Sequence, residues 1–126
     1  PELDKIIMNK SVHNKEKSKA FMAAKIVLNN LHPAVINGVN KRTFEIPACG
    51  GFQITSHRDA INELFEVGKE IVTYTDLNDL KYKIDYYLNP ENEVERKQIT
   101  EAGYQKAIQE HSYEKRLLKL LNTVFN

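Results

Sequence analysis

The sequence predicts an α/β domain with a small parallel sheet. Short apolar runs alternate along the 126 residues with longer segments of helical periodicity. A series of short strands, each followed by a helix, is typical of βαβ units, in which helices cover both faces of the sheet. The chain is long enough to bury a core, and its single cysteine cannot form an internal disulfide. We therefore expect one domain over residues 1–126, with a three-layer arrangement.

The predicted strands are short, apolar and rich in β-branched residues. The run at residues 26–28 is continuous, which is the pattern of a strand buried on both faces. Gly50-Gly51 and Gly68 separate the later runs from the segments before them. The four predicted strands are residues 5–8, 26–28, 52–55 and 70–74.

The predicted helices begin at capping residues. Asp76 with Asp79, and Ser56 with Asp59, have the spacing of a capping box, and Ser112 is expected to cap the final helix. The predicted helices are residues 14–24, 41–49, the segment opened by Ser56, and residues 77–88, 92–110 and 113–124. The apolar stripe of the final helix, which we expect to be core, consists of Tyr113, Leu117, Leu120, Leu121 and Val124.

The charge balance excludes some classes of protein. Lys and Arg number 18, and Asp and Glu number 17, which gives a net charge of +1 at pH 7. This excludes a strongly basic nucleic-acid-binding module, and no nucleic-acid partner is expected.

No apolar run approaches the ~20 residues of a membrane span, and residues 1–9 lack the apolar region of a signal peptide. We expect a cytoplasmic location, at most peripheral to the inner face of the membrane. Because Pro1 is not an initiator methionine, we also expect a processed chain or a piece of a longer one.

Two polar loops follow predicted strands and therefore lie where α/β domains bind ligands. The carboxyl ends of parallel strands form a crevice at one edge of the sheet. Residues 29–41 follow one predicted strand, and residues 55–58 follow the next. In the longer loop, Asn37, Gly38 and Asn40 allow a close approach to a ligand and supply hydrogen-bonding groups.

Three charged residues after this loop suggest a specific chemistry. Lys41 and Arg42 lie in the first turn of a predicted helix, where a phosphate on the exposed N–H groups would also be bound by the Arg42 guanidinium. Glu45 lies one turn further along, and a carboxylate can accept hydrogen bonds from both vicinal hydroxyls of a ribose. This turn could hold a nucleoside diphosphate without a metal. The alternative is a surface ion pair between Arg42 and Glu45, worth roughly a few tenths of a kcal/mol.

The histidines and the cysteine do not predict a metal site or a nucleophile. The four histidines have no spacing typical of metal ligands, so we expect no metal. His13, just after the first predicted strand, is a candidate binding residue, with a surface or capping role as the alternative. Cys49 lies between Ala48 and Gly50 and is expected to be a small buried thiol.

The segment at residues 37–52 carries a family resemblance. It reads Asn-Gly-Val-Asn-Lys-Arg-Thr-Phe-Glu-Ile-Pro-Ala-Cys-Gly-Gly-Phe and resembles the donor-binding segment of group 1 glycosyltransferases, in the branch similar to spore-maturation proteins. Further segments that resemble the family lie in order at residues 25–29, 63–72 and 111–116, so the resemblance covers nearly the whole chain.

The resemblance implies a GT-B fold, in which two Rossmann-like halves enclose the active site. This chain is similar to the C-terminal half, which binds the nucleotide-sugar donor, so we expect the N-terminal, acceptor-binding half to lie outside it. The family needs no cofactor beyond its nucleotide-diphosphate sugar substrate, and no metal is expected. In this resemblance Glu45, Arg42 and Lys41 match the family's donor-binding positions, Gly38 and Asn40 would line the donor pocket, and His13 lies where relatives approach the donor. Asn37 and Thr55 are further candidate binding residues because of their places in the two polar loops.

The implied function is transfer of a sugar from a nucleotide-diphosphate donor to a hydroxyl acceptor on a glycan, lipid carrier or protein. Glu45 would bind the ribose, and Arg42 would stabilise the leaving diphosphate, so these two are the candidate catalytic residues. The enzyme would be of the hexosyltransferase type, and we expect this half alone to be inactive. Where many retaining relatives carry a first glutamate, this chain has Asn37. The alternative is therefore a non-catalytic Rossmann-like binding or interaction module, a degenerate glycosyltransferase half.

Overall fold

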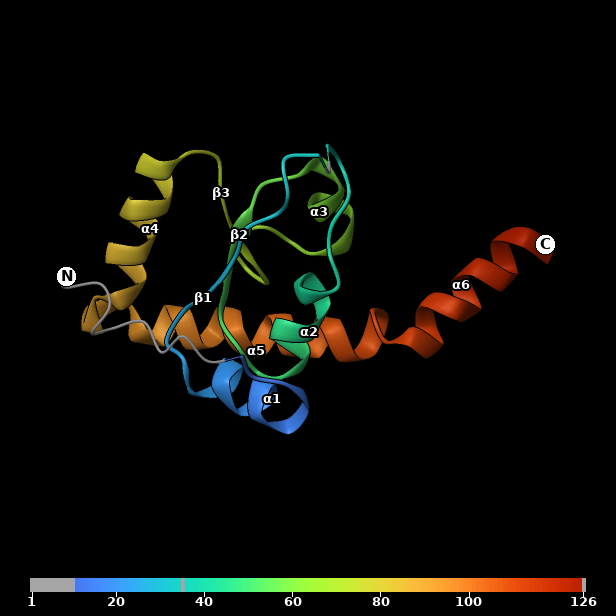
Figure 1. Cartoon of the computed structure of the whole chain (residues 1–126), viewed down its shortest axis with the longest axis horizontal. Helices are drawn as coiled ribbons and strands as arrows, with labels where there is room; N and C mark the ends of the chain where they lie inside the picture. Colours follow the sequence, from blue (N-terminus) through green and yellow to red (C-terminus); the bar gives the residue numbers. More distant parts are fainter. Residues whose placement is uncertain (1–10, 35, 126) are drawn as a thin grey trace.

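The computed structural model describes residues 11–34 and 36–125. They form an α/β domain in which helices surround a small parallel sheet (Figure 1). The elements are α1 (Asn14–Ala23), β1 (Val27–Asn29), α2 (Arg42–Ala48), β2 (Gln53–Ser56), α3 (Asp59–Leu64), β3 (Val72–Tyr74), α4 (Leu77–Leu88), the 3₁₀ turn η2 (Pro90–Asn92), α5 (Glu93–Glu110) and α6 (Tyr113–Phe125). The predicted strand at residues 5–8 lies outside the described residues.

The described sheet has three strands in the order β1-β2-β3, and both pairings are parallel. In the register, Ile54 of β2 lies opposite Leu28 of β1 and Val72 of β3. All four residues of β2 are buried, as expected for a central strand. The predicted α/β class with a parallel, Rossmann-like sheet is confirmed.

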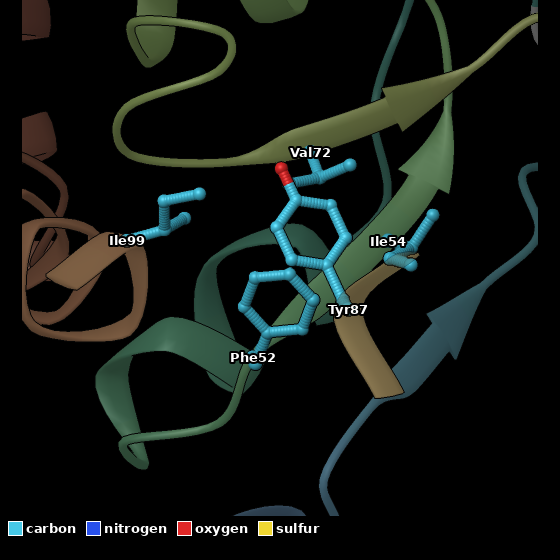
Figure 2. Packing of buried hydrophobic residues seen from close by; sticks show 5 residues of the cluster. All are labelled: Phe52, Ile54, Val72, Tyr87 and Ile99. Atoms are coloured by element: carbon cyan, nitrogen blue, oxygen red, sulfur yellow. The ribbon is translucent and has the colours of Figure 1, made fainter. Parts of the chain in front are cut away.

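One face of β2 builds an apolar core with α4 and α5. Ile54 packs with Phe52 and Val72, and Tyr87 of α4 and Ile99 of α5 close the cluster (Figure 2). The Phe52 and Tyr87 rings lie side by side, with their centroids 4.8 Å apart. Burial raises the pKa of the Tyr87 hydroxyl to about 12, so this ring is a neutral packing residue.

The other face of β2 is polar. Successive side chains of a strand point to opposite faces, so Gln53 and Thr55 lie opposite Ile54. Both are buried, and Gln53 donates a hydrogen bond to the Thr43 carbonyl of α2. The sheet is therefore apolar toward α4 and α5, and polar toward α2.

The long helix α5 runs past both α2 and the sheet (Figure 1). Gly103 permits this approach, because a Cβ at this position would lie 2.4 Å from the Glu70 carbonyl oxygen. Gly50 ends the α2 segment with a φ of +79°, a conformation that favours glycine. None of the helices described here has the length and apolar composition that crossing a membrane requires.

Two predicted features of the final helix and of α3 were wrong. The stripe of α6 is not core: Leu117 is 55% exposed and Leu120 is 58% exposed, and α6 projects away from the body (Figure 1). Ser56 does not cap a helix, because it ends β2, where its buried hydroxyl accepts a hydrogen bond from the Leu31 N–H (3.0 Å).

The cap of α4 is confirmed, with Asp76 accepting from the Asp79 N–H (2.8 Å). Ser112 likewise accepts from the Lys115 N–H (3.2 Å) at the start of α6.

The predicted strand at residues 26–28 is only partly buried. The structure shifts it by one residue, to Val27–Asn29, and leaves Leu28 half exposed. The reason is its position, since β1 is an edge of the described sheet. A continuous apolar run predicts a strand, but it does not say whether a neighbour covers it.

Candidate functional site

A buried polar cluster supports the start of α2. Asn29, at the end of β1, is 1% exposed, and its Nδ2 lies 2.9 Å from Gln53 Oε1 and 3.2 Å from Thr43 Oγ1. Thr43 is fully buried in the first turn of α2. These side chains satisfy one another inside the fold and tie β1, β2 and α2 together.

Asn40 links this cluster to the loop before α2. Its amide pairs with that of Asn29 in both directions, at 3.0 Å and 2.9 Å. Its Oδ1 also accepts from the Thr43 N–H (3.1 Å), as a helix-capping side chain does. The expected phosphate on the helix N–H groups would therefore have to share them with Asn40. The side chains of Lys41 and Arg42 are therefore more available to a phosphate than the helix N–H groups are.

Glu45 is held by two lysines. Its Oε2 is buried and lies 2.8 Å from Lys17 Nζ of α1, and its Oε1 lies 3.2 Å from Lys41 Nζ. The hydrogen bond from Lys17, and to a smaller extent the contact with Lys41, lowers the pKa of the Glu45 carboxyl. Glu45 is therefore ionised at neutral pH. The alternative considered for Glu45, an i, i+3 ion pair with Arg42, is not formed, and Lys17 and Lys41 are its partners instead. The carboxylate retains further lone pairs, so it can still accept hydrogen bonds from a ligand.

Two hollows lie beside this carboxylate. The first, which we call the α2–α6 hollow, has a volume of about 500 Å³. It is lined by Val39, Asn40, Lys41, Phe44, Glu45, Ala48, Ala107, Ile108, His111, Ser112, Tyr113 and Arg116. Its walls are mostly apolar, with Phe44 and Tyr113 as aromatic faces and Glu45 at its edge.

The second, which we call the α1–α2 hollow, has a volume of about 390 Å³. It is lined by Ser11, Val12, His13, Lys17, Phe21, Val27, Leu28 and Arg42. Arg42 is exposed here and has no ion-pair partner among residues 11–34 and 36–125. This hollow is basic where the α2–α6 hollow is apolar.

Two residues of the segment at 111–116 have a structural role. The His111 ring packs on Phe44 and Phe65, and its Nε2–H donates to the Leu64 carbonyl at 2.5 Å. The Arg116 guanidinium lies 4.4 Å from the centroid of the Phe44 ring, a cation–π contact. These contacts fix the junction of α5 and α6 against α2 and shape the α2–α6 hollow.

The structure brings together five of the eight predicted site residues. Asn40, Lys41 and Glu45 line the α2–α6 hollow, whereas His13 and Arg42 line the α1–α2 hollow. Both groups meet at the first turn of α2.

The other three predicted residues line neither hollow. Asn37 accepts a hydrogen bond from the Ala60 N–H (3.1 Å), which ties the loop to the start of α3, and Gly38 is exposed. Thr55 is fully buried, and its hydroxyl donates to the Asn29 carbonyl (3.0 Å). Thr55 therefore contributes through the buried cluster rather than through an exposed hydroxyl.

Sequence reasoning missed Lys17 and the buried cluster of Asn29, Thr43 and Gln53. A polar Gln53 inside an apolar strand was a usable signal for the cluster, because a buried amide needs partners. Lys17 gave no local signal, since its partner Glu45 is remote in sequence. Within the described part of the chain, no three His, Cys, Asp or Glu side chains are grouped so that they could hold a metal ion.

Comparison with known proteins assigns the family. The profile of a family described as glycosyl transferase-like matches residues 1–122. No curated protein and no solved structure gives a match. Because this match extends over nearly the whole chain, the chain belongs to the glycosyl transferase-like family.

Proposed function

We propose that this chain is the donor-binding half of a GT-B glycosyltransferase and that it binds a nucleotide-diphosphate sugar around Glu45. The observation that carries the proposal is the ionised Glu45 carboxylate, which two lysines hold between an apolar and a basic hollow. Family membership and the resemblance to the group 1, spore-maturation-like branch support it.

Glu45 is the residue proposed to bind the ribose. An ionised carboxylate only accepts hydrogen bonds, which matches the two vicinal hydroxyl donors of a ribose. The lysine contacts fix the orientation of Glu45 before a ligand arrives, which lowers the entropy that binding must overcome. The α2–α6 hollow beside it offers the exposed Tyr113 ring to the flat face of a nucleotide base.

The transfer itself needs little covalent chemistry from this half. The bond between the sugar C1 and the diphosphate oxygen breaks, and a bond forms between C1 and the acceptor hydroxyl oxygen. Negative charge gathers on the leaving diphosphate, where Arg42 stabilises it without a metal. The proton of the acceptor hydroxyl passes to a base in the acceptor-binding half. In this proposal the acceptor-binding half is a second Rossmann-like unit, and the donor half alone does not turn over.

Calorimetric titration with UDP, GDP, ADP and CDP tests the proposal. We expect one of them to bind, and Glu45→Gln to weaken its binding roughly tenfold, the size of a lost charge-assisted hydrogen bond. Glu91→Gln, an exposed glutamate in η2, is the matched control and should not change the affinity. No binding of any of the four at millimolar concentration would contradict the proposal. Unchanged affinity in Glu45→Gln would favour the non-catalytic binding module.

A further inference from the structure

The helix α6 is exposed along its whole length. None of its residues is buried, and it projects away from the body of the domain (Figure 1). One side of the helix is turned toward the body: Arg116 lies on the Phe44 ring, and Lys119 and Thr123 line a space beside Leu64 of α3. The remaining side of α6 is free to meet a partner.

The apolar side chains of α6 form one continuous face on that free side. Their helical spacing places them next to one another over more than three turns. Val124 is 64% exposed and Phe125 is 78% exposed, at the end farthest from the body. A run of large exposed apolar side chains of this kind is typical of a surface that a partner covers. The apolar face of α6 consists of Tyr113, Leu117, Leu118, Leu121, Val124 and Phe125.

The other face of α6 is basic. It carries Lys115, Arg116 and Lys119 and no acidic residue. Glu114 is the one anion of α6, and it lies in the first turn, next to the body. Within the part of the chain that the structure describes, Lys115 and Lys119 have no ion-pair partner. The helix therefore combines an exposed apolar face with an excess of positive charge.

We propose that α6 binds the surface of an anionic membrane, where it lies in the headgroup region with its apolar face toward the acyl chains. A basic polar face opposite Leu and Phe side chains is typical of helices that lie in a membrane interface. The leucines leave water there, and the lysines attract anionic headgroups. With 13 residues, α6 is too short to cross a bilayer, so it lies on the surface. The proposal does not depend on nucleotide binding around Glu45.

The rival occupant of this face is a second copy of the chain. Pairing two α6 helices would cover the same leucines, but it would also bring their cations together, with only Glu114 of each helix to offset them. Like charges repel one another, whereas phosphate headgroups attract the lysines. The charge of α6 therefore favours an anionic membrane over a second copy.

Sedimentation of the whole chain with lipid vesicles tests the proposal. We expect vesicles of equal parts phosphatidylcholine and phosphatidylglycerol to bind the chain more tightly than phosphatidylcholine alone, and added salt to weaken the binding. Leu121→Gln should weaken it roughly tenfold, and Lys119→Gln about fivefold. Leu77→Gln, at an exposed leucine of α4, is the matched control and should bind like the wild type. A circular dichroism melt of each variant shows that it folds.

The proposal is wrong if the chain binds both kinds of vesicle equally, or if Leu121→Gln binds no more weakly than Leu77→Gln. Absence of vesicle binding by the wild type would also overturn it. In that case analytical ultracentrifugation identifies the alternative. A dimer that Leu121→Gln dissociates would assign the apolar face to a second copy, and a monomer would assign it to another part of the enzyme, such as the acceptor-binding half.

Discussion

The two faces of β2 differ in what their contacts are made of. Toward α4 and α5, Ile54 packs in an apolar cluster with Phe52 and Tyr87, whereas toward α2, Gln53 is hydrogen bonded to Asn29. Apolar packing is nearly non-directional and supplies most of the stability. Hydrogen bonds are directional, so the polar face fixes where α2 and Glu45 lie. One short strand therefore supports stability on one side and the geometry of the site on the other.

The largest expected effect on stability lies on the apolar face. Phe52→Ala removes a ring packed on Tyr87 and leaves a cavity, so we expect a loss of about 3–5 kcal/mol in the free energy of unfolding. Urea denaturation measures it. Tyr82→Ala, at a ring that is 66% exposed, is the control and should change the stability much less. A loss below about 1 kcal/mol in Phe52→Ala would show that this face does not carry the core.

A smaller loss of stability, with a larger effect on the site, is expected on the polar face. Asn29→Ala leaves Gln53, Thr43 and Asn40 short of partners, at about 1–3 kcal/mol. Because the loop and the start of α2 lose their anchor, nucleoside diphosphate affinity should also fall under conditions where the variant is folded. Asn62→Ala on the exposed surface of α3 is the matched control. If Asn29→Ala lowers the stability and leaves the affinity unchanged, the polar face has no positioning role.

The smallest expected effect is the pH dependence of the Glu45 ion pairs. Lys17 and Lys41 lower the pKa of Glu45 below its ordinary value of 4.5, so the unfolded chain binds the proton more tightly than the folded one. The stabilisation is therefore complete above pH 4.5 and is lost as the pH falls through the lower, folded-state pKa. We expect Glu45→Gln to be less stable than the wild type at pH 7 and to converge with it at acid pH. A difference independent of pH in urea titrations would mean that the ion pairs do not stabilise the fold.

The sequence predicted the positions of the helices and strands better than the burial and tertiary contacts of their side chains. The capping pair Asp76 and Asp79 is local, so the start of α4 could be read directly. Ser56 has the same spacing but lies in β2, because long-range hydrogen bonds with Leu31 and Asn30 replace the local one. The stripe of α6 is apolar at helical spacing, yet spacing does not show whether another element covers it.

For the site, the sequence located the segment and missed part of its surroundings. Glu45, Arg42 and Asn40 follow one another closely, so their neighbourhood was predictable from the loop and the turn of helix. The contact of Glu45 with Lys17 depends on how α1 packs against α2, which no spacing within either segment encodes. The buried role of Thr55 is of the same kind, because its partner is the Asn29 carbonyl on the neighbouring strand.

Amide NMR of the chain during titration with a nucleoside diphosphate is the most direct test of nucleotide binding around Glu45. We expect the largest shifts on residues 40–45 and on Lys17, with α4 unaffected. We expect Glu45→Gln to reduce these shifts strongly at the same ligand concentration, because its affinity falls roughly tenfold. Shifts confined to α4 and α5, or shifts that persist unchanged in Glu45→Gln, would contradict nucleotide binding at this site.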